Sequence, residues 1–253
     1  MMICSKKYFG RLLIAVTPYL FLGCLRTYYP MYYYSNPLPI VNETDNNLEK
    51  GSKFLSLDFN SSEGEYDNEF TKIFKGSYVY SNTQNHSNFN FSLYGFGGSY
   101  KVSGIANYSF LNSDKFDGNK TAFGAGADMK FALNFKFDKV KLGAGLTFAL
   151  TTEFGKYTNF REEAKKQNLI DSEQSWIFVT GSGFPYLSFE LANDMNLTAQ
   201  LNIGYPGFVS PILSLNKANT ICWINIIYNG YDEQVIRTAL GVMVDVNQIF
   251  NAF

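Results

Sequence analysis

The sequence predicts an all-β protein, an antiparallel up-and-down β-barrel of about ten strands whose apolar side faces lipid; eight or twelve strands are the alternatives. Two observations lead to this fold class. Long segments alternate apolar and polar residues with a period of two, and turn residues separate them at short intervals. Aromatic residues make up 17% of the chain and 21 residues are glycine. Lipid-facing walls use aromatics on the outer face and glycine where strands crowd.

The strongest signal is a predicted hairpin of two long strands, 121–137 and 140–157, joined by the turn Asp138-Lys139. Apolar residues occupy odd positions in the first strand and even positions in the second. Because a two-residue turn pairs its flanking residues on one side of the sheet, this switch keeps one continuous apolar face. An apolar face about 17 residues long favours a membrane barrel over a soluble sandwich. The opposite face carries five charged residues: Asp128, Lys130, Lys136, Lys141 and Glu153.

The other strand candidates follow the same period and, in chain order, cover 54–60, 71–82, 88–102, 105–111, 174–192, 196–205, 208–215, 219–229 and 234–250. With the central hairpin they make about eleven, and bacterial single-chain barrels have even strand numbers, so one candidate is expected to be wrong. Within 88–102 the aromatic residues move from odd to even positions. This shift, next to Gly95, Gly97 and Gly98, predicts a β-bulge.

The connections differ in length. Those near 103, 138, 193 and 217 are short, whereas those near 115, 167 and 232 are longer or more polar. Short turns at one end and larger loops at the other are typical of outer-membrane barrels, although the first two strands do not fit this alternation. The polar insert 161–173 is expected to be a surface loop, with a short helix as the alternative.

Residues 1–23 have the features of a secretory signal peptide. A basic segment with Lys6, Lys7 and Arg11 precedes the apolar run 12–23 and then Cys24. Twelve helical residues at about 1.5 Å each are too short to span a hydrocarbon core of roughly 30 Å.

The residues Leu20-Phe21-Leu22-Gly23-Cys24 resemble the lipobox of bacterial lipoprotein precursors, with Phe21 departing from the leucine usual at its position. The resemblance implies that Cys24 is lipidated, with palmitate among its acyl groups, and becomes the mature N-terminus. The alternative is ordinary cleavage near Gly23 that leaves Cys24 a free thiol. The expected domains are a lipid-anchored tether over 24–52 and a β-barrel over 53–253.

The tether is predicted because Pro30, Pro37 and Pro39 block regular pairing and a polar run follows them. Two other interpretations stay open for its tyrosine-rich part. The tyrosines can lie at a membrane interface, where amphipathic rings are favoured, or the segment can plug or line the barrel.

The C-terminal run LGVMVDVNQIF resembles the last strand of outer-membrane β-barrel proteins, which alternates apolar residues and ends in an aromatic, here Phe250. The chain departs from that pattern by a three-residue extension that ends at Phe253. The resemblance implies a location in the bacterial outer membrane.

The sequence offers little catalytic chemistry. Its one histidine, His86, directly precedes Ser87, so on a strand the two side chains would point to opposite faces. This spacing disfavours a barrel lipid hydrolase. No spacing typical of metal ligands or phosphate-binding loops is present, and no cofactor or metal is expected. Cys222, in an apolar run, is expected to be a buried thiol without a partner.

The function expected from these features is that of a monomeric, lipid-anchored outer-membrane barrel, not an enzyme, with a structural, narrow-pore or surface-binding role. The five charged residues then either tune what passes through the lumen or fill it with mutual ion pairs. The alternative is a soluble β-sandwich or β-barrel lipoprotein that binds a ligand or host partner. After removal of 1–23 the chain has 18 basic and 22 acidic residues, a net charge of −4, and no basic patch predicts nucleic-acid binding.

Overall fold

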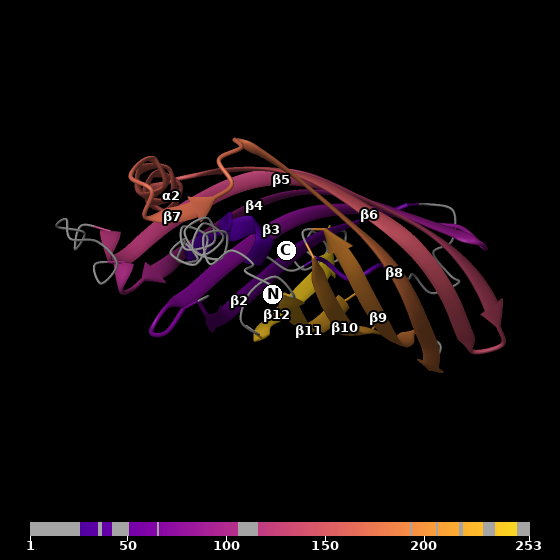
Figure 1. Cartoon of the computed structure of the whole chain (residues 1–253). Coiled ribbons are helices and arrows are strands. Elements are labelled where there is room, and N and C mark those ends of the chain that lie inside the picture. The colour runs from indigo at the N-terminus through magenta and orange to yellow at the C-terminus, as the bar shows by residue number, and fades with distance from the viewer. Residues whose placement is uncertain are drawn as a thin grey trace, which may run out of the picture.

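Ten antiparallel strands close into a barrel in a computed structural model that describes residues 26–34, 37–41, 51–64, 66–105, 116–192, 194–205, 207–217, 220–229 and 236–246 (Figure 1). The wall strands are β2 (Ser52–Glu63), β3 (Phe70–Thr83), β4 (Ser87–Val102), β5 (Gly118–Phe137), β6 (Val140–Phe154), β8 (Ile177–Ala192), β9 (Met195–Tyr205), β10 (Phe208–Lys217), β11 (Thr220–Asn229) and β12 (Ile236–Asp245). Each pairs with the next wall strand along the chain, and β12 closes the ring on β2. The predicted up-and-down barrel of ten strands is confirmed.

The connections divide the barrel into two unlike ends. Four connections of two or three residues (84–86, 138–139, 193–194 and 218–219) define what we call the turn end. The opposite, loop end has the connections 64–69, 103–117, 155–176, 206–207 and 230–235. Because β2 starts and β12 stops at the turn end, the wall begins and finishes on the same side of the barrel.

Two predictions about β4 and the segment that follows it are wrong. Strand β4 pairs directly with β5, so the wall has no place for the candidate strand 105–111, of which residues 106–111 lie outside the described residues. Removing this candidate restores the alternation of turns and loops for the first strands. The predicted β-bulge is also wrong, because β4 keeps an unbroken register with both β3 and β5. Its later aromatics, Tyr94, Phe96 and Tyr100, simply face the lumen and are buried.

The insert after β6 folds as a helix, α2 (Lys156–Lys166), and a short strand, β7 (Ile170–Ser172), rather than the expected surface loop. The helix buries residues at a helical spacing: Tyr157, Phe160, Arg161 and Ala164. Two of these residues precede residue 161, where the predicted insert begins. The predicted insert therefore contains only half of the buried positions that show the helical spacing. The helix stops at Gln167, and Asn168 follows with a φ of 55°.

The outer face of the wall is apolar. Leu57, Phe74 and Phe135 expose 69%, 63% and 62% of their surface, and outward residues of every wall strand continue this belt. The inward neighbours are polar, as with Ser56 and Asp58 beside Leu57. A soluble barrel with a buried apolar core requires the reverse arrangement. Ten strand residues at about 3.3 Å each, tilted by about 40°, reach roughly 25 Å, which matches the apolar band of membrane barrels.

Candidate functional site: a lumen filled by the N-terminal segment

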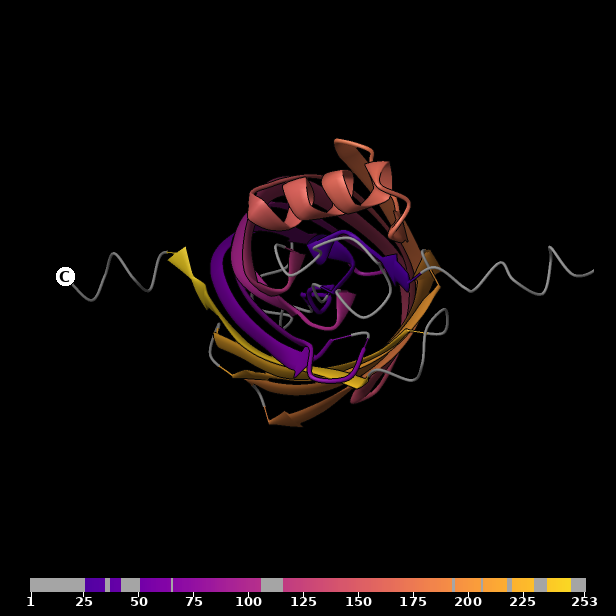
Figure 2. The same ribbon diagram turned by 60° about the vertical axis from the view of Figure 1, so that its left-hand side comes forward.

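The lumen of the barrel contains the chain's own N-terminal segment, which we call the plug (residues 26–34 and 37–41). It comprises β1 (Arg26–Tyr28), the 3₁₀ helix η1 (Met31–Tyr34) and an extended stretch, 37–41. Figure 2 shows this indigo segment within the ring of strands, with α2 across the rim. Of the interpretations open for this region, the packing of the described residues matches the plug. Cys24, the signal peptide and the region 42–50 lie outside the described residues.

At the loop end, the plug is held by a buried carboxylate. The hydroxyl of Tyr28 donates to Oε1 of Glu69, and that of Tyr100 donates to Oε2 over 2.6 Å. The backbone N–H of Ser103 also donates to Glu69, over 3.1 Å. Burial raises the pKa of the Glu69 carboxyl above its ordinary value, and burial beside Glu69 raises that of Tyr28. Glu69, which directly precedes β3, therefore joins the plug to β4 and to the start of the connection after it through hydrogen bonds.

Arg26 fixes the start of the plug at the same end. Its guanidinium lies 4.4 Å from the centre of the Tyr66 ring and donates to the Ser103 carbonyl over 2.6 Å. Strand β1 pairs in parallel with β7, so the helix-containing connection 155–176 also contacts the plug. The connection 155–176, which we call the cap, therefore packs on the plug.

The middle of the plug contacts both the wall and α2. Tyr32 stacks on Tyr94 of β4 with ring centres 5.5 Å apart, and its N–H donates to Oε2 of Glu153 over 3.2 Å. The other oxygen of Glu153 accepts from Arg161 of α2 over 2.7 Å, with both side chains buried. Arg161 also donates to the carbonyl of Glu173 over 2.7 Å. One carboxylate therefore links the wall, the plug and the cap.

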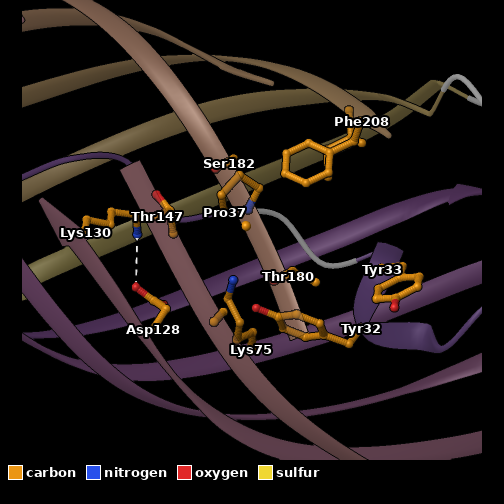
Figure 3. A pocket seen from close by; sticks show the side chains of 13 residues that line it. Tyr32, Tyr33, Pro37, Lys75, Asp128, Lys130, Thr147, Thr180, Ser182 and Phe208 are labelled. Atoms are coloured by element: carbon orange, nitrogen blue, oxygen red, sulfur yellow. Dashed lines mark hydrogen bonds and ion pairs between the residues drawn. The ribbon is translucent and has the colours of Figure 1, made fainter. Parts of the chain in front are cut away.

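One small cavity lies beside η1 in the lumen. A cavity of about 40 Å³ is lined by residues that include Tyr32, Pro37, Lys75, Asp128 and Lys130 (Figure 3). A water molecule needs at least about 10–15 Å³ by this measure, so the cavity has room for only a few waters. Lys130 pairs with Asp128 over 3.2 Å, and Lys75 pairs with Asp58 of β2 over 3.6 Å. These ion pairs, together with the plug, fill this part of the barrel.

At the turn end, wall side chains bind the backbone of the plug. The N–H of Ile40 donates to Gln200 over 2.8 Å, and the N–H of Val41 donates to Asn90 over 3.2 Å. Asn88 donates back to the carbonyl of Val41. Apolar plug side chains pack against inward wall residues in the same region: Leu38 and Val41 against Phe54, Val79, Ile212, Ile221, Trp223 and Met243, and Ile40 against Ala132, Phe184 and Tyr186.

The five charged residues predicted to face the lumen divide into two groups. Asp128, Lys130 and Glu153 are buried in the lumen and take part in the ion pairs above. Lys136 and Lys141 lie opposite each other in the strand register of the hairpin, near the turn end. Lys136 is exposed there, and its Nζ lies 3.7 Å from Oε2 of Glu190. The structure thus brings only part of the predicted set together.

Sequence reasoning missed Glu69, Arg161 and the amide side chains Asn88, Asn90 and Gln200. One feature of the sequence does indicate the plug. Aromatic residues occupy inward positions of β4, where an unfilled lumen would be lined by polar residues. The sequence alone predicts a bulge at this shift, because nothing in a single strand shows what fills the space opposite it.

Three other predicted positions are now placed. Cys222 lies on the exposed outer face of β11 and is not buried, contrary to expectation. His86 is exposed in the turn between β3 and β4. Among the described residues, no group of three or more His, Cys, Asp or Glu side chains is placed to hold a metal ion, and no helix is long and apolar enough to cross a membrane.

No known sequence family and no curated protein matches this chain. Among solved structures, the chain is similar to the outer membrane protein OprG from Pseudomonas aeruginosa, at 8% identity over 77% of this chain and 93% of that one, with a TM-score of 0.35. It is also similar to a deltaS2S3 mutant of the monoaromatic hydrocarbon channel TodX, at 14% identity over 88% and 72%, with a TM-score of 0.39. The translocator domain of the autotransporter NalP from Neisseria meningitidis gives 11% identity over 94% of both chains and a TM-score of 0.36.

The chain has the fold of an outer-membrane β-barrel. Its own strand pairing, apolar outer face and polar lumen establish this, since the structural likenesses are too weak to add to it.

Proposed function

We propose that this protein is an integral barrel of the bacterial outer membrane that stays closed to solutes and presents its loop end as a structural or binding surface. The observation that carries the proposal is the plug, which occupies the lumen from Glu69 at one end to Asn88 at the other. The outward apolar belt supports the membrane location, because exposed apolar area of this extent is unfavourable in water.

Conductance across a planar lipid bilayer tests the closed lumen. The wild-type protein is expected to show no steady current steps, whereas a variant lacking residues 26–41 is expected to conduct. A double variant, Asn88→Ala with Asn90→Ala, removes two backbone contacts of the plug and provides a milder test, with brief openings expected. Steady wild-type current that neither change alters would overturn the proposal.

We further propose that Cys24 carries a lipid. The support is the lipobox-like segment Leu20 to Cys24 and the short apolar run before it. Mass spectrometry of the mature N-terminal peptide is expected to find a diacylglyceryl-modified and acylated Cys24. An unmodified Cys24 thiol, or an N-terminus elsewhere, would contradict this part of the proposal.

A further inference from the structure

The plug crosses the barrel in one direction, from the loop end to the turn end. Its first residues contact groups of the loop end, since Arg26 binds Ser103 and Tyr28 binds Glu69. Its last described residue, Val41, binds Asn88 and Asn90 in the first turn-end residues of β4. The wall then begins at the turn end with β2. The chain therefore runs through the lumen before it builds the wall around it.

The described part of this passage has specific polar contacts near both ends of the barrel and at η1. The carboxylates of Glu69 and Glu153 bind the part of the plug nearer the loop end. The buried amides of Asn88, Asn90 and Gln200 bind backbone groups of the part nearer the turn end. These three amide residues expose 1%, 1% and 4% of their surface. Buried polar groups are costly unless they are paired, so the wall is adapted to a chain in this position.

We infer that the chain preceding the plug leaves the barrel at the loop end, and that the lipid on Cys24 is anchored in the membrane leaflet on that side. Two peptide units separate Cys24 from Arg26, a reach of about 7 Å. In bacterial barrels the longer loops face the outside and the short turns face the periplasm. The anchor then lies in the outer leaflet, at the cell surface. This inference depends on the proposed membrane location and on the proposed lipidation.

Epitope tags in the full-length chain test the sidedness. One tag follows Leu25, a second lies within residues 106–115 of the loop-end connection 103–117, and a third lies between Asp138 and Lys139 at the turn end. On intact cells, antibody is expected to reach the first and second tags, and to reach the third only after permeabilisation. If the tag after Leu25 behaves like the turn-end tag, the inference is wrong. If the turn-end tag is reached on intact cells, the orientation with the turns in the periplasm is wrong, and with it the placement of the anchor at the cell surface.

Cysteine pairs test the threading without tags, in a Cys222→Ser background. Thr27→Cys with Asp171→Cys joins the plug to the loop end at paired strand positions, and Val41→Cys with Asn88→Cys joins it to the turn end, where the Asn88 side chain contacts Val41. Both pairs are expected to cross-link in membranes, whereas a control pair, Thr27→Cys with Asn88→Cys, is not. Cross-linking of the control pair, or of neither matched pair in heat-resistant barrels, would overturn the threading.

Discussion

At the scale of single residues, Glu69 makes the attachment of the plug sensitive to pH. Burial raises its pKa above the ordinary 4.5 although Tyr28, Tyr100, the Ser103 N–H and Arg26 all favour the charged form. A carboxyl whose pKa is higher in the folded state than in the unfolded state binds protons more strongly when folded. Its stabilising contribution is therefore complete below pH 4.5 and is lost as the pH rises through the raised value.

We expect the melting temperature in detergent to include a component that falls from acidic to neutral pH. Glu69→Gln is expected to remove that component, because the amide does not titrate. The comparison concerns the slope of melting temperature against pH, since the amide also changes the hydrogen bonds of Tyr28 and Tyr100. Identical slopes for the two proteins would show that Glu69 is not the titrating group.

A second residue-scale prediction concerns the ion pair between Arg161 and Glu153. Arg161→Met leaves a buried carboxylate without its partner, which typically costs about 3–5 kcal/mol. The exposed pair of Lys165 and Asp171 is a matched control on the same helix, and Lys165→Met is expected to cost no more than about 1 kcal/mol. Thermal unfolding in detergent measures both.

The double variant Arg161→Met with Glu153→Gln separates charge from packing. It is expected to recover part of the loss, because the uncompensated charge is gone. Equal losses for the variants at Arg161 and Lys165 would mean that the buried pair does not hold the cap in place.

At the scale of strands and helices, the sequence predicts the wall well because the wall strands have an apolar outer face and, over much of their length, a polar inner face. The period of two is then visible in the chain itself, as in β5, β6 and β9. The sequence predicts a helix only as the alternative to a loop at α2, because the buried positions of α2 contact the plug and Glu153, and the plug is distant in sequence. The bulge predicted in β4 is wrong for the same reason. The inward aromatics of β4 pack on the plug, and Tyr32, which stacks on Tyr94, lies 62 positions away from it in the sequence.

The outer face of β2 gives a test of the lipid-facing wall. Leu57 lies in the middle of the strand and is 69% exposed, so Leu57→Arg would have little effect in a soluble protein. In a membrane barrel, a basic residue near the midplane costs about 2–4 kcal/mol. Glu63→Arg, at the exposed loop-end terminus of the same strand, is expected to be tolerated. Folding yield into lipid vesicles compares them, and equal yields would contradict the lipid-facing wall.

At the scale of the whole molecule, the barrel and the plug depend on each other. The wall alone would enclose inward amides and carboxylates facing an empty space, and the plug alone has no partner for its backbone groups. The sequence predicts the ten-stranded wall but only part of the lumen, because the lumen is made by residues from opposite ends of the chain. The charged residues of β5 and β6 were found from their own strand, whereas the amides that bind the plug were not.

The most direct test of this account is hydrogen exchange of the plug's backbone amides in the lipid-embedded wild-type protein. The N–H groups of Tyr32, Ile40 and Val41 donate to the buried side chains of Glu153, Gln200 and Asn90. They are therefore expected to be protected to a degree comparable with the wall strands. Exchange at the rate of an unfolded peptide at these three amides, with the wall still protected, would show that the lumen is not filled by this segment.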